Sequence, residues 1–263
     1  MTRDSNGPVA VITGASRGLG QGLAAHFAAQ GVHLGLCARH QPAAVRTTRT
    51  AHDSPRGVSS DAVRAAVDVT DRAALDRFAA DVIERFGRID LWVNNAGLLG
   101  PIGPLADLDP AAVARIIDVN VTGVLHGSAA FAAHLRSRPG PGTLVNISSG
   151  AASTPYVGWA AYCGSKAAVE QLTRVVALEE AAHGLVAYAV SPGLVDTDMQ
   201  AAVRAADEAH FPEVERFRRA AAQHAFNSPA WVGSHILALA FGGERPEAVS
   251  VRVPDQPGVA RTG

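Results

Sequence analysis

The chain has few of the features that mark secreted or membrane proteins. Of its 263 residues only two are cysteines, Cys37 and Cys163, and both lie in apolar or helical stretches. Two such cysteines do not make the disulfide framework of a secreted domain, so we expect buried free thiols. Residues 1–8 are polar and lack the apolar stretch of a signal peptide, and no run of about 18 apolar residues occurs. We therefore expect a cytoplasmic protein without a transmembrane helix.

Neither sign of charge is in excess, and no metal-binding motif is present. The chain has 23 Lys and Arg against 24 Asp and Glu, a net charge of −1, and no basic stripe. A nucleic-acid partner or an anionic membrane is therefore not indicated. Ten histidines occur, but none forms an H-x-x-x-H or H-E-x-x-H pair with a supporting ligand. We expect scattered surface histidines and no metal site.

Short apolar runs alternate with longer amphipathic stretches along the chain, which is the pattern of a parallel sheet flanked by helices. The clearest helix is predicted to begin near Thr70 and to end at Gly87, with apolar residues at helical spacing between them. The strands are predicted at residues 8–12, 32–38, 62–67, 89–93, 143–148, 185–190 and 248–253. The sequence therefore predicts an α/β fold, a single Rossmann-type doubly wound domain over residues 1–263, with about seven parallel strands and helices on both faces.

Two polar segments interrupt this alternation. Residues 40–61 are rich in Thr, Ser, Pro and Arg, with little apolar periodicity, and we expect a long loop or frayed helix there. Residues 196–228 carry charges and two prolines after the sixth predicted strand. A polar insertion beyond the carboxyl end of a strand is typical of a substrate lid.

A glycine-rich segment joins the first predicted strand to the first predicted helix. Residues 9–12 are Val-Ala-Val-Ile and run directly into Thr-Gly-Ala-Ser-Arg-Gly-Leu-Gly at 13–20. Glycines at such a turn let the backbone approach a pyrophosphate, whose charge then faces the N-terminus of the helix. The predicted cofactor contacts in this loop are Gly14, Ser16, Arg17, Gly18, Leu19 and Gly20.

The same segment also fits G-x-S-x-G, the nucleophile elbow of the α/β-hydrolases. That motif follows a central strand and needs an oxyanion loop from earlier in the chain. Because only 13 residues precede Gly14, we expect neither element upstream of it. A dinucleotide loop is the interpretation that remains.

The end of the second predicted strand indicates which dinucleotide is bound. NAD enzymes usually carry an acidic residue there to hold the ribose hydroxyls. This chain instead has Cys-Ala-Arg-His at residues 37–40. Either arginine alone is better explained as a solvated surface charge, but Arg39 and Arg17 together could clamp a 2′-phosphate, for which a guanidinium is well suited. We therefore expect NADP(H) as the cofactor.

A tyrosine and a lysine four residues apart, Tyr162 and Lys166, share one face at the start of a predicted helix. A nearby ammonium stabilises a phenolate, so Lys166 is expected to lower the pKa of Tyr162 and make it a usable general acid or base. Ser149 lies at the carboxyl end of the fifth predicted strand, where α/β sheets gather ligand-binding groups. Its hydroxyl could hydrogen-bond a carbonyl oxygen as charge develops on it.

With the glycine loop, Ser149, Tyr162 and Lys166 in this order, the chain resembles the short-chain dehydrogenase/reductase family over nearly its whole length. The resemblance implies that Asn120 is a fourth catalytic residue, holding a water that relays protons to Lys166. It also implies that Lys166 binds the nicotinamide ribose. Further cofactor-binding residues implied by the family's motifs are Asp68 and Val69 near the adenine, Asn95, Ala96 and Gly97 in the N-N-A-G motif, and Pro192, Gly193, Val195 and Thr197 beside the nicotinamide.

Residues 158–163, 177–180 and 196–200 resemble the sepiapterin-reductase and benzil-reductase-like members of that family. Two departures concern the substrate. The usual D-G-G ending is missing, and Arg252 stands where the sepiapterin enzymes carry a pterin-anchoring aspartate. The resemblance implies a ketone flanked by a second carbonyl or an aromatic group, with sepiapterin a poor substrate. The predicted substrate-pocket residues are Trp159 and Met199, with Phe211 and Phe217 as further apolar walls.

These observations predict an NADP(H)-dependent oxidoreductase that reduces a ketone or diketone carbonyl, or oxidises the corresponding alcohol. A dehydratase or epimerase on the same fold is one alternative, and a non-catalytic dinucleotide-sensing protein, which would be expected to lose Tyr162 or Lys166, is another. The family usually pairs long helices equivalent to residues 111–136 and 160–181, which implies a homodimer, with a homotetramer as the alternative. The apolar stripe that supports pairing consists of Val113, Ile116, Ile117, Val121 and Val124.

Overall fold

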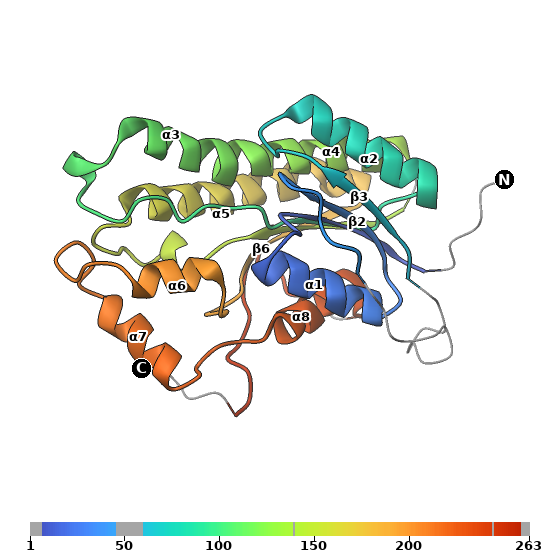
Figure 1. Ribbon diagram of the computed structural model, residues 1–263. Coiled ribbons are helices and arrows are strands. Elements are labelled where there is room, and N and C mark those ends of the chain that lie inside the picture. Colours follow the sequence, from blue (N-terminus) through green and yellow to red (C-terminus); the bar gives the residue numbers. More distant parts are fainter. Residues whose placement is uncertain (1–6, 46–59, 139, 244, 259–263) are drawn as a thin grey trace.

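The computed structural model describes residues 7–45, 60–138, 140–243 and 245–258. Within these ranges, one parallel sheet of seven strands has the order β3-β2-β1-β4-β5-β6-β7 (Figure 1). The strands are β1 (Val9–Thr13), β2 (His33–Ala38), β3 (Ala62–Ala66), β4 (Leu91–Asn94), β5 (Gly142–Ile147), β6 (Leu185–Ser191) and β7 (Ser250–Arg252). Each strand overlaps the segment predicted from the sequence.

Helices cover both faces of this sheet. They are α1 (Gly18–Ala29), α2 (Arg72–Phe86), α3 (Pro110–Ile117), α4 (Gly123–Ser137), α5 (Ala160–Glu180), α6 (Asp198–Arg204), α7 (Val214–Ala222) and α8 (Pro229–Phe241). Short 3-10 turns are η2 (Leu105–Asp107), η4 (Gly150–Ala152) and η5 (Ala181–His183), and η3 (Asp118–Thr122) is a π-helical turn between α3 and α4. The predicted doubly wound α/β fold is confirmed.

Successive side chains of a strand point to opposite faces, and each face has its own core. In β1, Ala10 and Ile12 pack with α1 and α8, whereas Val9 and Val11 pack with α2 and α4. Figure 1 shows α1 and α8 below the sheet and α2, α4 and α5 above it. Because β1 pairs with both β2 and β4, the chain winds outward from β1 in both directions. That switch of direction opens a crevice at the carboxyl ends of the strands.

The helix predicted to begin near Thr70 shows how the local sequence sets an element's ends. The side chain of Asp71 accepts a hydrogen bond from Ala74 N at 2.9 Å and caps the N-terminus of α2. Gly87 follows the helix at φ +82°, the left-handed conformation that glycine adopts without strain. The predicted apolar face is buried at Leu75, Phe78, Val82 and Phe86.

Two sequence expectations about polar residues are wrong. Cys37 is buried, but Cys163 in the first turn of α5 is only half-buried. The histidines are not all at the surface, since His33 and His134 are buried. Each accepts a main-chain hydrogen bond, His33 from Asp61 N and His134 from Ile89 N. Burial lowers the pKa of both imidazoles and favours the neutral form that can accept.

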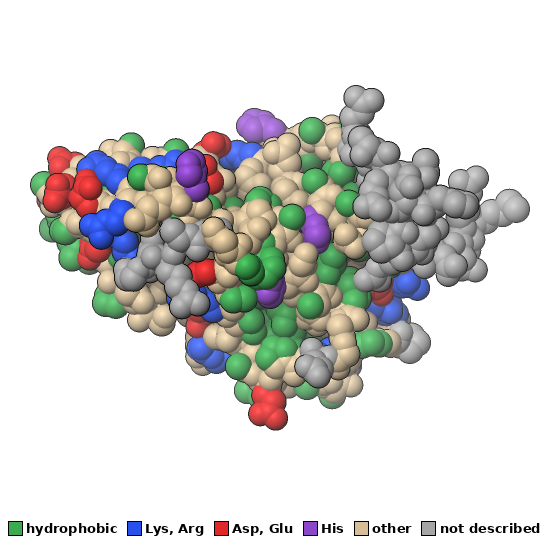
Figure 2. Space-filling view, turned by 90° about the horizontal axis from the view of Figure 1, so that it is seen from below, with side chains coloured by type: hydrophobic (Ala, Val, Ile, Leu, Met, Phe, Trp, Pro, Cys, Tyr) green, Lys and Arg blue, Asp and Glu red, His purple; other side chains and the backbone are tan. Residues whose placement is uncertain are grey.

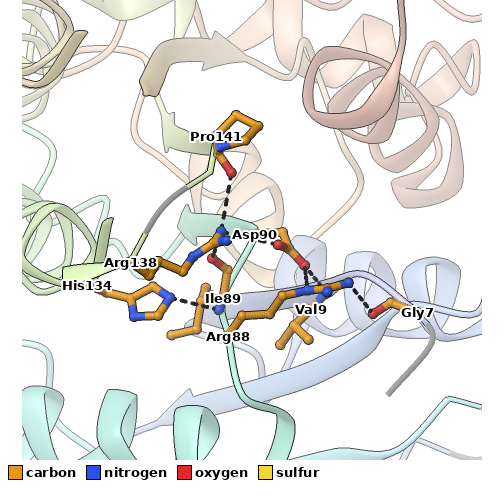
Figure 3. A network of polar contacts seen from close by, with 8 residues as sticks. All are labelled: Gly7, Val9, Arg88, Ile89, Asp90, His134, Arg138 and Pro141. Atoms are coloured by element: carbon orange, nitrogen blue, oxygen red, sulfur yellow. Dashed lines mark hydrogen bonds and ion pairs between the residues drawn. The ribbon is translucent and has the colours of Figure 1, made fainter. Parts of the chain in front are cut away.

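The amino-terminal edge of the sheet is held by a network centred on Asp90 (Figure 3). Its carboxylate accepts hydrogen bonds from Val9 N at 2.9 Å, from Arg88 Nε at 2.9 Å and from Arg138 Nη2 at 3.3 Å. The Arg138 guanidinium also donates to the main-chain oxygen of Ile89 at 3.0 Å. These contacts join the start of β1 to the start of β4 and to the end of α4.

The two polar segments differ in how much of them can be described. Of residues 40–61, positions 46–59 lie outside the described residues, and the positions on either side form neither helix nor strand. Residues 196–228 contain α6 and α7, which lie apart from the two helical layers at one end of the molecule (Figure 1). Their apolar side chains form a third core cluster with Trp159 and Tyr162.

The continuous helical stretch Pro110–Ser137 is long and apolar enough to cross a membrane by length and composition alone. It packs against other parts of the fold, however, because α4 contacts α2 and α5, and 56% of its most apolar window is buried. A core helix passes the same test. The stretch is therefore weak evidence for a membrane span.

Candidate active site

A cavity of about 580 Å³ lies at the carboxyl ends of the strands. Its lining includes residues from the glycine loop, the end of β2, the N-N-A-G segment, the end of β5, the start of α5, residues 191–199 and α7. Every predicted cofactor, catalytic and substrate-pocket residue lines it except Phe211 and Asn120, and Asn120 lies behind Gly97. Residues that are far apart in the sequence thus meet at one site.

The glycine loop is packed so tightly that side chains are excluded. Gly14 has φ +67°, and a Cβ there would lie 2.7 Å from Ala96 Cα. A Cβ on Gly20 would lie 2.4 Å from Gly14 O, so α1 begins directly against the loop. Arg17, the N-cap of α1, makes no side-chain capping bond, so the first N–H groups of this 12-residue helix stay available to an anion. This cradle fits the pyrophosphate of a dinucleotide.

Thr13 and Asn95 brace the loop from the β4 side, and sequence reasoning missed the role of Thr13. The Thr13 hydroxyl accepts hydrogen bonds from Asn95 N at 3.0 Å and from Ala96 N at 3.1 Å. The Asn95 amide donates to Thr13 O at 3.0 Å and to Gly14 O at 3.2 Å. The only sequence signal was a buried polar residue at the end of β1. These bonds fix the spacing between the two halves of the crevice.

The cavity is basic at the tip of β2, where the sequence predicts the adenosine ribose. Ala38, Arg39 and His40 line it, and Arg39 is exposed. Arg17 forms an exposed ion pair with Asp198 at 3.1 Å, a contact that the sequence did not predict. This pair links the glycine loop to the first residue of α6. None of the residues at the tip of β2 is acidic.

Asp68, the predicted adenine contact, lines the cavity with its carboxylate already engaged. It accepts hydrogen bonds from Thr70 N at 3.0 Å and from Arg115 Nη2 at 2.9 Å. Partial burial alone would raise the pKa of Asp68, but the hydrogen bonds from Thr70 and the Arg115 guanidinium lower it below its usual value. The group is therefore ionised, and Arg115 is a partner that sequence reasoning missed.

Ser149, Tyr162 and Lys166 meet where β5 leads into η4 and α5. The side chain of Ser149 lies near the Tyr162 hydroxyl and acts to lower the pKa of that phenol. Lys166 Nζ donates to Ile147 O at 2.9 Å and lies 5.7 Å from the centroid of the Tyr162 ring. Tyr162 and Lys166 are 8% and 7% exposed, so both polar ends are held away from bulk water.

Burial sets the pKa values of this pair, and it overturns one expectation. Burial raises the pKa of Tyr162 to about 12, although the side chain of Ser149 acts in the opposite direction. Burial also lowers the pKa of Lys166 to about 8. The expectation that Lys166 brings the pKa of Tyr162 below its usual value is therefore wrong for the protein alone, because loss of hydration outweighs the ammonium, which is bound to a main-chain oxygen.

Asn120 lies in the π-helical turn η3, a local widening that the hydrophobic pattern gave no sign of. Such turns are common at functional sites. Its Oδ1 accepts from Leu98 N at 2.7 Å, and its Nδ2 donates to Leu98 O at 2.8 Å and to Ser165 Oγ at 3.1 Å. Both amide hydrogens are thus used to tie the segment after β4 to α5. A Cβ on Gly97 would lie 3.4 Å from Asn120 Oδ1 and 3.8 Å from Lys166 Nζ. Gly97 is therefore close to both side chains.

Aromatic residues wall the end of the cavity nearest α6 and α7. Trp159 stacks on Phe211 at 4.6 Å and meets the Tyr162 ring edge-on at 5.4 Å. Trp159, Met199 and Phe217 line the cavity as predicted, but Phe211 does not, because it is fully buried behind Trp159. Trp159 Nε1 is buried and has no hydrogen-bond partner in the part of the chain that the structure describes.

Asn227 organises the segment after β6 and was not identified from the sequence. Its side chain donates to Pro192 O at 2.9 Å and to Pro254 O at 3.3 Å, and accepts from Gln256 N at 2.8 Å. A Cβ on Gly193, at φ +73°, would lie 2.8 Å from Asn227 Nδ2. Asn227 thus clamps the predicted nicotinamide segment to the chain end, where exposed Arg252 lines the cavity 3.7 Å from Asp255.

Comparison with known proteins agrees with this geometry. The model of the short chain dehydrogenase family matches residues 8–208. A benzil reductase ((S)-benzoin forming) of Bacillus subtilis (strain 168) is 31% identical over 233 residues, covering 87% of this chain and 91% of the relative. The 3beta-hydroxysteroid dehydrogenase 1 of Eggerthella lenta is 35% identical over 201 residues, with 76% of each chain covered.

Solved structures agree in fold. The crystal structure of the KRED1-Pglu enzyme has a TM-score of 0.76 at 30% identity, covering 92% of this chain and 98% of that one. A short-chain type dehydrogenase/reductase from Mycobacterium marinum has a TM-score of 0.78 at 26% identity, covering 95% and 94%. The chain therefore belongs to the short-chain dehydrogenase/reductase family and is an oxidoreductase of the kind that acts on alcohols and ketones.

Proposed function

We propose that the protein is an NADP(H)-dependent carbonyl reductase that acts on a ketone or diketone and runs in the alcohol-oxidising direction with the matching alcohol. One observation carries this proposal. The pyrophosphate cradle at Gly14 and Gly20 and the neighbouring side chains of Ser149 and Tyr162 open into the same cavity. A site that only sensed the dinucleotide would have no need of a buried phenol and a buried lysine beside it.

Each residue of the site has a role that follows from its contacts. Bound NADP(H) supplies the hydride. The Ser149 hydroxyl holds the substrate oxygen, and Tyr162 donates the proton to it as negative charge develops. Lys166 stabilises the phenolate that remains, because its ammonium lies over the Tyr162 ring. Asn120 positions the segment after β4 through its bonds to Leu98, and the family resemblance implies that it also holds a water that relays protons to Lys166.

The preference for NADP(H) rests on Arg39 and Arg17 beside an alanine at position 38. A charge-assisted hydrogen bond contributes roughly 1.5–3 kcal/mol, so a preference of at least about tenfold in kcat/KM over NADH is expected. The double variant Ala38→Asp, Arg39→Ala places a carboxylate at the ribose and should shift the preference towards NADH. Equal kcat/KM with both cofactors in the unmodified enzyme would contradict this assignment.

The substrate is proposed to be an aromatic or vicinal diketone. A carbonyl next to a second carbonyl or an aromatic ring is electron-poor and accepts hydride readily. Two of the similar proteins are benzil reductases, those of Bacillus subtilis and Bacillus cereus, and aromatic Trp159 lines the cavity. Exposed Arg252 would leave the hydrogen-bond donors of a pterin ring unpaired, which disfavours sepiapterin.

The experiment is a rate comparison with NADPH and NADH over benzil, 1-phenyl-1,2-propanedione, a simple aliphatic ketone and sepiapterin. Cofactor oxidation and the chiral alcohol formed are both measured. Benzil or the phenyl dione should have the highest kcat/KM. If sepiapterin were fastest, the interpretation of Arg252 would be wrong. If no carbonyl compound consumed reduced cofactor while the dinucleotide still bound, a sensing role or a dehydratase or epimerase would replace the proposal.

The protein is also proposed to be a cytoplasmic homodimer, with a homotetramer as the alternative. Of the predicted stripe, Ile116 and Val124 are buried, whereas Ile117 is partly exposed. Leu125 on α4 and Leu178 on α5 are 45% and 82% exposed, so these neighbouring helices retain apolar surface that pairing would cover. Light scattering at micromolar concentration tests the assembly, and a monomer would refute it.

A further inference from the structure

The cationic groups that line the cavity are not equivalent. They are Arg17, Arg39, Lys166, Arg216 and Arg252. Arg17 pairs with Asp198, and Arg252 lies 3.7 Å from Asp255. Arg39 stands at the adenosine end, next to the tip of β2, and Lys166 is bound to a main-chain oxygen beside the proton donor. Arg216 on α7 is the lining cation at the aromatic end of the cavity.

Arg216 is held by a neutral group rather than by a carboxylate. Its Nη1 donates to the hydroxyl of Tyr156 at 3.3 Å. Tyr156 also lines the cavity, so the two side chains form part of its rim. No Asp or Glu among the described residues lies within ion-pair distance of the Arg216 guanidinium. The positive charge of Arg216 is therefore positioned at the rim by Tyr156 and is not neutralised by a carboxylate of the described residues.

The other arginines of α7 do not line the cavity. Arg218 pairs with Glu215 and donates to the main-chain oxygens of Arg204 and Ala206. Arg219 is exposed and does not line the cavity. Figure 2 shows charged side chains gathered at the end of the molecule where α6 and α7 lie, whereas the middle of that face is mostly uncharged. Among the arginines of α7, Arg216 alone has its guanidinium directed to the cavity rim.

The path from the proton donor to this guanidinium is aromatic. Trp159 meets the Tyr162 ring at 5.4 Å between centroids, and Tyr156 meets Trp159 at 5.1 Å. The hydroxyl at the far end of Tyr156 then meets Arg216. A carbonyl held at Tyr162 therefore has an aromatic wall beside it and a cation beyond that wall. An aryl ring is the group that fits the wall, and a carboxylate fits the Arg216 fork.

We infer that Arg216, held by Tyr156, is a specificity-determining residue that binds an anionic group on the side of the substrate remote from the reacting carbonyl. The substrate class is an aryl ketone or aryl diketone that carries a carboxylate beyond its ring. This inference rests on the proposed carbonyl reduction and narrows its substrate. A neutral diketone fills the aromatic part of the site and leaves the guanidinium to water.

The test compares two substrates that differ in one charge, 4-(2-oxopropanoyl)benzoate and its methyl ester. Because Arg216 is exposed at a rim, its ion pair is partly screened, and the acid should have a KM about fivefold below that of the ester, with little difference in kcat. In Arg216→Gln the ratio of the two KM values should approach one. Arg216→Lys keeps the charge and should restore part of the ratio. Arg219→Gln, which removes the same charge from the same helix away from the cavity, should leave the ratio as in the unmodified enzyme.

A binding measurement separates failure of this inference from failure of the proposed reaction. Calorimetric titration of the acid and the ester into the protein with oxidised cofactor reports affinity without turnover. Tighter binding of the acid, lost in Arg216→Gln, supports the anion site even if neither compound is reduced. Equal binding of acid and ester, or an acid preference that survives Arg216→Gln, overturns the inference even if both compounds are good substrates. Rising salt should weaken the acid preference and leave ester binding unchanged.

Discussion

At the amino-terminal edge of the sheet, Asp90 receives hydrogen bonds from Val9 N, Arg88 and Arg138, so its charge is matched by the chain's own groups (Figure 3). At the carboxyl-terminal edge, the Lys166 ammonium donates to one main-chain acceptor, Ile147 O, and lines the cavity. Trp159 Nε1 is buried there without a partner among the described residues. Polar side chains are thus paired with one another at the amino-terminal edge, whereas those at the carboxyl-terminal edge keep unused hydrogen-bonding capacity.

The difference follows from what a parallel sheet leaves open at each edge. At the amino-terminal edge the polar groups bind one another, and the unmatched buried atoms there among the described residues are Arg138 Nε and His33 Nε2. The carboxyl-terminal edge carries the crevice created by the switch between β1 and β4, and its polar groups keep bonding capacity for a ligand. Saturated groups stabilise the fold, whereas unsaturated buried groups cost stability and provide chemistry. Substitutions at the two edges should therefore separate activity from stability.

The largest effect is expected for Tyr162→Phe. This change removes the transferable proton and keeps the ring that packs against Trp159. General acid catalysis typically contributes about 10²–10⁴-fold, so kcat for ketone reduction should fall by that factor. Cofactor affinity, measured by fluorescence titration with NADPH, should change little because the pyrophosphate cradle is untouched. A variant that kept more than a tenth of the original rate at neutral pH would remove Tyr162 from its assigned role.

At the opposite edge, Asp90→Asn should lower stability and spare catalysis. The change leaves Arg88 and Arg138 with a neutral acceptor in a place where the carboxylate is only 17% exposed. Losing charge-assisted hydrogen bonds of this kind costs about 2 kcal/mol in the free energy of unfolding. Urea unfolding measures the loss, and kcat/KM should stay within about twofold of the original value because Asp90 is remote from the cavity lining.

Asp76→Asn is the matched control for that experiment. It makes the same chemical change in the ion pair between Arg72 and Asp76, whose side chains are 40% and 46% exposed. Surface ion pairs of this type contribute about 0.3–0.5 kcal/mol, so the free energy of unfolding should change little. If both variants lost the same amount of stability, the saturated network at Asp90 would have no special role.

The parts of this comparison that depend on local pattern could be predicted from the sequence. The strands were visible as apolar runs, and the spacing of Tyr162 and Lys166 placed both on one face of α5. Gly14 and Gly20 marked the cradle because a tight turn and a close approach leave no room for a side chain. In each case the signal lies within a few residues of the feature that it predicts.

The parts that depend on contacts between distant segments could not be predicted. The π-helical turn that carries Asn120 leaves no mark in the hydrophobic period. The clamp of Asn227 on Pro192 joins positions 35 residues apart. The upward shift in the pKa of Tyr162 comes from burial, which is a property of the packed molecule and not of the Y-x-x-x-K pattern. Such features need the tertiary structure.

Lys166 offers the finest test, because it is the single lysine among 23 basic residues of the chain. Arginine stays charged even when buried, whereas lysine can lose its proton there. The pKa of Lys166 is lowered to about 8 by burial. Lysine labelled with carbon-13 at Cε gives one resonance from one residue, so its titration reads this pKa without assignment. A midpoint near 10.5 would show that the ammonium is hydrated, and the contrast between the two edges would then fail.

The last prediction concerns how the stability of the protein depends on pH. Between pH 8 and 10.5 the unfolded chain binds more protons than the folded one at Lys166, so stability of the unmodified protein should rise with pH across that window. Below pH 8 the folded protein keeps the buried charge at a net cost of about 3 kcal/mol, even though the ammonium donates a hydrogen bond to Ile147 O. Lys166→Met removes both, and should therefore be more stable than the unmodified protein by about 1–2 kcal/mol at pH 7 while losing activity. The stability gain of Lys166→Met should be smaller at pH 9.5 than at pH 7. The upper value is chosen because, at higher pH, the raised pKa of Tyr162 begins to lower the stability of the protein. Urea unfolding at pH 7 and pH 9.5 measures the difference in the free energy of unfolding between Lys166→Met and the unmodified protein. If the variant were less stable at pH 7 and equally stable at pH 9.5, Lys166 would be a stabilising residue like Asp90.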